Sequence, residues 1–109
     1  MATVYKVLGQ SNPAATTATT LYTCPSSTET IFSTLNIANL AASAATFRVA
    51  IRPDGASLTA QHYLAYDVSI GANNSTALTL GGTMNAGDVV TVYASNTNLA
   101  FTLFGSEIA

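Results

Sequence analysis

A chain of 109 residues is close to the commonest length of one domain and can bury a core without disulfide or metal staples. Hydrophobic residues make up 49% of the chain and charged residues only 7%, which is the opposite of a disordered composition. The net charge is −2, and the three cations, Lys6, Arg48 and Arg52, are too scattered to bind nucleic acid or an anionic membrane. We therefore expect one domain over residues 1–109, with neither of these partners.

The N-terminal residues MATVYKVLGQSNP lack the long apolar core of a signal peptide. No stretch reaches the roughly 18 consecutive apolar residues of a membrane-spanning helix. We expect the protein to be made and folded in a cytoplasm. Cys24 is the single cysteine, so an internal disulfide is impossible.

Apolar and polar side chains alternate along most of the chain, which is the period of β-strands. The clearest case is ATFRVAIR at 45–52, where Phe47, Val49 and Ile51 share one face and Pro53 begins a turn. The stretch NLAASAA at 39–45 is expected to be a loop. In chain order, the predicted strands are residues 3–8, 20–24, 29–38, 45–52, 61–70, 75–80, 88–95 and 99–104.

Turn signals at intervals of roughly 8–12 residues are typical of a sandwich or barrel. We predict an all-β fold, an antiparallel sandwich of about eight strands. Eight strands suit a jelly roll, and an immunoglobulin-like sandwich is the alternative. From their period-two phasing, the predicted core residues are Phe47, Val49, Ile51, Leu64, Tyr66, Val68, Leu78, Leu80, Val90, Val92, Phe101 and Leu103.

The segment 13–20, PAATTATT, has no large side chain that could anchor it in a core. It is either a long loop of the sandwich domain or an arm that lies on a neighbouring chain.

The residues needed for catalysis are scarce. Nucleophilic catalysis requires a nucleophile, a base and an orienting group, but the chain has one histidine, His62, and one cysteine, Cys24. We interpret His62 as a strand-boundary residue that is solvated or donates one hydrogen bond, and Cys24 as a structural thiol. The scattered acids favour neither paired-carboxylate chemistry nor a calcium site: Glu29, Asp54, Asp67, Asp88 and Glu107. We therefore predict no catalytic residue, cofactor or metal.

Arg48 and Arg52 lie on the same face of the predicted strand 45–52. Charge is scarce elsewhere, so these two arginines are candidate interface residues that form ion pairs across chains. The alternative is a solvated outer face.

Several stretches together resemble a family of small virion proteins of tailed phages, including phages of cyanobacteria and marine bacteria. These are YKVLGQSNPAATTATTLYTCP, FRVAIRPDG, QHYLAYDV, NAGDVVTVYAS and FTLFGSEIA. The resemblance implies a structural role in the particle, as a head decoration (cement) protein or a tail accessory. It implies the major capsid protein or tail proteins as partners and location in the virion. The high hydrophobic and low charged content predicts a homo-oligomer, and the resemblance favours a trimer.

A second hypothesis is a tail- or fibre-associated adhesin that binds carbohydrate. Its aromatic platforms would come from Tyr5, Tyr22, Tyr63 or Tyr93, although the chain has no tryptophan. An enzyme is the third hypothesis, and the sequence supports it least.

Overall fold

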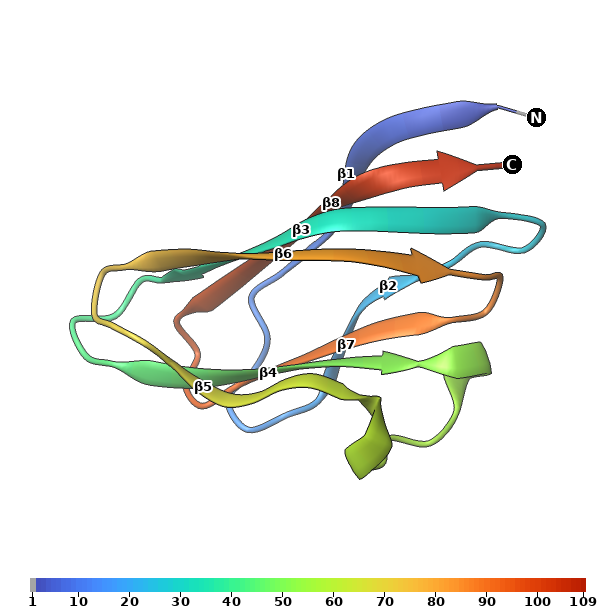
Figure 1. Cartoon of the computed structure of the whole chain (residues 1–109). Coiled ribbons are helices and arrows are strands. Elements are labelled where there is room, and N and C mark those ends of the chain that lie inside the picture. The colour runs from blue at the N-terminus through green and yellow to red at the C-terminus, as the bar shows by residue number, and fades with distance from the viewer. Residues whose placement is uncertain (1) are drawn as a thin grey trace.

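Eight strands and two short 3-10 turns between β4 and β5 form the fold in the computed structural model, which describes residues 2–109 (Figure 1). The 3-10 turns are η1 (Pro53–Gly55) and η2 (Ala60–His62). The strands are β1 (Thr3–Ser11), β2 (Thr19–Thr23), β3 (Glu29–Asn39), β4 (Ala45–Arg52), β5 (Tyr63–Ile70), β6 (Ser75–Met84), β7 (Val89–Ala94) and β8 (Leu99–Ile108).

The strands form two four-stranded antiparallel sheets packed as a sandwich, which confirms the predicted fold class (Figure 1). The first sheet has the order β1-β8-β3-β6, and the second sheet has the order β2-β7-β4-β5. The pairs β1–β8, β2–β7, β3–β6 and β4–β5 are nested, as if one long hairpin had been rolled up. This nesting is the jelly-roll pattern and differs from the strand order of an immunoglobulin sandwich.

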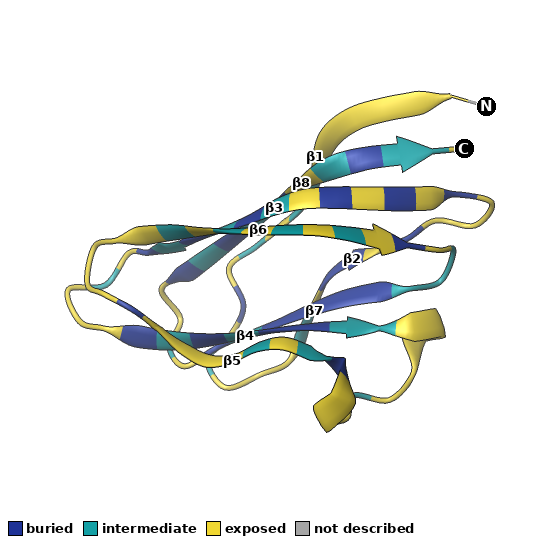
Figure 2. Cartoon of the chain, in the orientation of Figure 1, coloured by how far each residue is buried: buried dark blue, intermediate teal, exposed yellow. Residues whose placement is uncertain are grey.

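The core lies between the sheets (Figure 2), and half of the predicted core residues are buried there. The first four residues of β7, Val89 to Val92, are all buried, so this central strand is covered on both faces. Six residues of the predicted set are buried: Phe47, Val49, Val90, Val92, Phe101 and Leu103. Three more are partly buried and pack against the core: Ile51, Leu78 and Leu80.

The prediction was wrong for Leu64, Tyr66 and Val68, which are 50%, 56% and 41% exposed on β5. The register between β4 and β5 shifts twice, so that Tyr66 and Asp67 together face the single residue Arg48. Asp67 takes a left-handed φ of 52° at this β-bulge. The bulge turns Tyr66 to the outer face, and β5 is an edge strand with no neighbour to cover its far side.

A second bulge, in the first sheet, explains two further differences. The register of β3 shifts after Phe32 against both β6 and β8, and Ser33 is the extra residue of β3 opposite β8. The pattern of ETIFSTLNIA predicts that Ile31 shares a face with Leu35 and Ile37, but the bulge buries Phe32 and leaves Ile31 43% exposed. We expected Gly81 and Gly82 to end the strand at residue 80, but β6 continues to Met84. A Cβ at Gly82 would lie 2.1 Å from the Phe32 ring, so glycine lets this ring pack over the strand.

The segment 13–20 connects the two sheets, and its last two residues begin β2. The Asn12 side chain donates to the carbonyl oxygens of Thr97 and Leu99, each at 2.8 Å, and the Thr16 N–H donates to the Ala94 carbonyl. The connection therefore lies as a loop against its own chain. A contact of this segment with a neighbouring chain stays a prediction. No helical segment of residues 2–109 is long and apolar enough to cross a bilayer.

Candidate interaction surfaces

Arg48 projects from β4 onto the outer face of the second sheet, where it is held by three side chains. Its Nε donates to Asp67 Oδ1 at 2.6 Å and its Nη2 donates to Asp67 Oδ2 at 3.3 Å. The guanidinium carbon lies 4.1 Å from the ring centroids of both Tyr66 and Tyr93. The hydrogen bond to Asp67 raises the pKa of Arg48, so the cation stays charged between two aromatic faces.

Arg52 lies on the same outer face, as the sequence predicts, but its partners are neutral. Its Nε donates to Thr91 Oγ1 at 3.1 Å, and its Nη1 donates to the carbonyl oxygens of Gly55 and Ala56 at 3.3 and 3.0 Å. Within residues 2–109 no carboxylate pairs with Arg52, whereas Arg48 already has Asp67. An ion pair with another chain stays a prediction for both residues. Arg48 would have to give up its bonds to Asp67 to form one, whereas Arg52 would not.

An aromatic hollow of about 490 Å³ lies beside the Arg48 cluster. The rings of Tyr63 and Tyr66 meet edge to face, with centroids 4.8 Å apart, and Leu58, Thr59 and Ala60 complete the walls. The hollow is therefore mostly apolar, with the hydroxyls of Thr59 and the two tyrosines as its polar side-chain groups.

A second exposed apolar surface lies on the outer face of the first sheet. We call it the β1–β8 patch, and it consists of Tyr5, Val7, Ile31 and Phe104. Tyr5 and Ile31 lie on either side of Ser106 in the ladder, and Val7 is directly opposite Phe104. These four side chains are 84%, 45%, 43% and 40% exposed, in the order given. Tyr5, Ile31 and Phe104 border a shallow hollow of about 520 Å³.

On the inner side of the same strands, a polar network joins the two sheets. The Tyr22 hydroxyl donates to Glu107 Oε2 at 2.5 Å and lies 2.8 Å from Thr30 Oγ1, while Lys6 Nζ donates to Glu107 Oε1 at 2.9 Å. Burial, followed by the bond to Glu107, raises the pKa of Tyr22. The hydrogen bonds from Tyr22 and then Lys6 lower the pKa of Glu107. The network therefore holds a carboxylate and a neutral phenol in one fixed arrangement.

The single histidine and the single cysteine both lie in local turns, and the Cys24 thiol also borders the polar network at Thr30. His62 lies at the end of η2, directly before β5, where its Nδ1 accepts the Thr59 N–H at 3.1 Å. It is a strand-boundary residue, as expected, but it is buried rather than solvated. The Cys24 thiol is buried and contacts the Thr28 carbonyl at 3.3 Å and Thr30 Oγ1 at 3.2 Å. Both side chains stabilise local turns.

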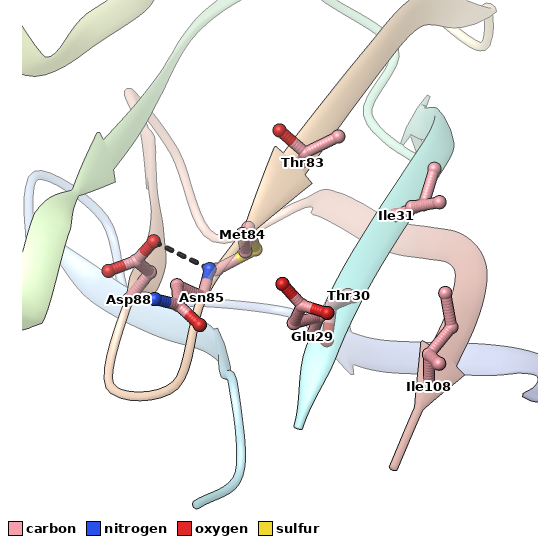
Figure 3. A pocket seen from close by; sticks show the side chains of 8 residues that line it. All are labelled: Glu29, Thr30, Ile31, Thr83, Met84, Asn85, Asp88 and Ile108. Atoms are coloured by element: carbon pink, nitrogen blue, oxygen red, sulfur yellow. Dashed lines mark hydrogen bonds between the residues drawn. The ribbon is translucent and has the colours of Figure 1, made fainter. Parts of the chain in front are cut away.

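A hollow of about 470 Å³ opens at the end of the sandwich, between the ends of β3 and β8 and the β6–β7 turn (Figure 3). Glu29 and Asp88 line it. The Asp88 carboxylate accepts the backbone N–H groups of Asn85 and Asp54, each at 2.9 Å. Asp88 therefore acts as a turn residue. Across residues 2–109, no three side chains of His, Cys, Asp or Glu come together as a metal site.

Sequence reasoning placed Arg48 and Arg52 correctly but missed the residues around them. Tyr66 was assigned to the core, and Asp67 had no role, because period-two phasing cannot detect a bulge. Tyr22 was a candidate sugar platform, but it is buried. Comparison with family models, with characterised proteins and with solved structures finds no match for this chain.

Proposed function

We propose that this chain is a non-enzymatic structural protein of a tailed-phage virion, a capsid decoration (cement) protein that stabilises the particle by protein–protein contacts. The observation that carries this proposal is the β1–β8 patch. Tyr5 is 84% exposed in a sheet face that also presents Val7, Ile31 and Phe104. Four neighbouring apolar side chains exposed on one sheet face are typical of a surface that another protein covers.

The chemistry of this face supports an interface. Of the four patch residues none is charged, and the strands beside them carry Thr, Ser and Ala on the same side. Desolvating charged groups is costly, whereas hydroxyl groups can form hydrogen bonds across a contact. Cores of protein interfaces are depleted in charge and enriched in Tyr and Phe.

The resemblance to small phage virion proteins supports the same class of function. It favours the major capsid protein or the tail proteins as partners, the virion as location after synthesis in the host cytoplasm, and a trimer as the oligomer. The fold alone supports no particular function, because β-sandwiches serve many.

The proposal is tested by binding to purified particles that lack the chain. Phe104→Ser should weaken binding strongly, because Phe104 lies in the middle of the patch. Leu40→Ser is the matched control, since Leu40 is 67% exposed in the loop after β3, outside the patch. Quantitative mass spectrometry of native virions should find the chain at high copy number for a head protein. Absence from virions, or equal binding by both variants, would contradict the proposal.

A second candidate is a tail- or fibre-associated adhesin, which the aromatic hollow of Tyr63 and Tyr66 favours. A sugar ring stacks on an exposed aromatic face, and Tyr66 is 56% exposed. Binding of the isolated chain to a glycan array, lost in Tyr66→Ala, would support this function. If the chain binds no glycan on the array, the adhesin function is contradicted and the decoration protein remains the proposed function.

A further inference from the structure

A sandwich has four edge strands, which here are β1 and β6 in the first sheet and β2 and β5 in the second. The unpaired peptide groups of an exposed edge can pair with another chain, and charges, bulges or short strands hinder such pairing. Three of these edges have such a feature. β1 has Lys6 and a register shift, β2 has only five residues, and β5 has the bulge with Asp67.

The edge of β6 is different. Its ten residues, STALTLGGTM, include no charged residue and no proline. Pairing with β3 is regular from Ser75 to Thr79, and the register shift comes only after Thr79. The inward-facing Leu78 is only half-buried, whereas its partner Leu35 on β3 is fully buried. This edge therefore lies open to solvent.

The register shows which peptide groups of β6 point outward. The Asn39 N–H donates to the Asn74 carbonyl, and hydrogen-bonded pairs alternate along an antiparallel ladder. The peptide groups of Ser75, Ala77 and Thr79 therefore point away from β3. In agreement, the Ser75 N–H is bonded to the side chain of Asn74 at 2.8 Å rather than to β3.

We propose that two copies of this chain pair antiparallel through β6, about a two-fold axis at Ala77, and so join their first sheets into one continuous sheet. The part of β6 that is free to pair runs from Ser75 to Thr79 and has Ala77 at its centre. It begins at Ser75, whose N–H already donates to the Asn74 side chain, and it ends at Thr79, where the bulge begins. Ala77 exchanges both backbone hydrogen bonds with Ala77 of the second copy. The Thr79 N–H of each copy donates to the Ser75 carbonyl of the other.

A second copy suits this edge for three reasons. The same short stretch supplies both the donors and the acceptors, as a two-fold contact requires. Ser75 then lies beside Thr79 of the other copy, and such hydroxyl pairs stabilise antiparallel strands. The half-buried Leu78 is covered by the added strand.

The contact rests on the proposed function, because it is small. Five residues of edge bury far less than the roughly 1,200 Å² of a stable interface. Pairing should be weak between free molecules and strong between copies already held next to each other on a particle. Since a two-fold contact cannot close a trimer, it would join molecules of neighbouring trimers.

Cysteine cross-linking of the concentrated protein tests the register. At a hydrogen-bonded antiparallel pair the Cα atoms lie about 5.5 Å apart, which a disulfide can span. Ala77→Cys should form a disulfide-linked dimer on mild oxidation. Ser75→Cys and Thr79→Cys should cross-link with each other when mixed, and poorly when alone. Thr83→Cys is the matched control. Thr83 is also exposed on β6, but in the proposed dimer it lies far from Thr83 of the second copy. The native Cys24 is buried in the sandwich and should not compete in the cross-linking.

We expect Ala77→Cys to cross-link about tenfold faster than Thr83→Cys, because pairing raises the local thiol concentration. Equal rates for these two variants, or efficient cross-linking of Ser75→Cys alone, would overturn the contact. Ala77→Lys should leave binding to particles through the β1–β8 patch intact. Particle binding therefore tests the proposed function separately, whatever the cross-linking shows.

Discussion

Replacing Tyr22 by phenylalanine removes one hydroxyl from the polar network between the two sheets. Tyr22 is 8% exposed, and its hydroxyl is the donor to Glu107 and the neighbour of Thr30. The ring, which packs in the core, is kept. Thr30 retains the Cys24 thiol as a partner, and Glu107 retains Lys6.

The expected cost follows from the charge of the acceptor. A hydrogen bond to a charged group contributes about 1.5–3 kcal/mol. Since both former partners of the hydroxyl keep one other contact, we expect Tyr22→Phe to lower the free energy of unfolding by about 2 kcal/mol. For a domain of this size, that corresponds to a fall of about 8 °C in Tm. Urea unfolding, followed by circular dichroism, measures it.

The pH dependence gives a second readout. The network lowers the pKa of Glu107, so its contribution is present above the unfolded pKa of about 4.3 and is lost as the pH falls through the folded value. Tyr22→Phe should therefore lose less stability than the wild type between about pH 5 and pH 3. A change below about 0.5 kcal/mol at pH 7, with an unaltered acid profile, would refute a stabilising role for the network.

Three further substitutions test other parts of the account. Phe47→Ala, in the centre of the core, should cost about 3–5 kcal/mol in urea unfolding, and a near-neutral result would mean that the faces of β4 are reversed. Gly82→Ala places a Cβ against the Phe32 ring and should cost about 1–3 kcal/mol, whereas Gly71→Ala, whose Cβ would meet only the Asn74 side chain at 3.9 Å, is the control. His62→Asn should leave particle binding intact, and loss of binding with an unchanged circular dichroism spectrum would give His62 a functional role.

The local patterns of the sequence predicted much of the fold. β4 begins and ends where the alternation of ATFRVAIR predicts, and Pro53 follows it directly. What the sequence could not show was how strands pair across long separations. Lys6 and Glu107 are 101 residues apart in the chain and meet only because β1 pairs with β8.

The candidate surfaces were harder to predict than the core, because they depend on bulges. One extra residue reverses the faces of a strand, and neither Tyr66–Asp67 on β5 nor Ser33, the extra residue of β3 opposite β8, is a glycine or a proline. Tyr66 was therefore assigned to the core, and Ile31 to the same face as Leu35 and Ile37, although Tyr66 and Ile31 both lie on the outer faces. Arg48 was placed correctly, but its partner Asp67 follows from the bulge alone.

The central claim is that this protein works by packing against other protein chains. Sedimentation velocity of the isolated protein, alone over a wide concentration range and mixed with purified particles that lack it, tests this most directly. We predict self-association at high concentration and co-sedimentation with the particles, the latter reduced by Phe104→Ser. A monomer of 11.2 kDa at every concentration that leaves the particles unbound would contradict the account.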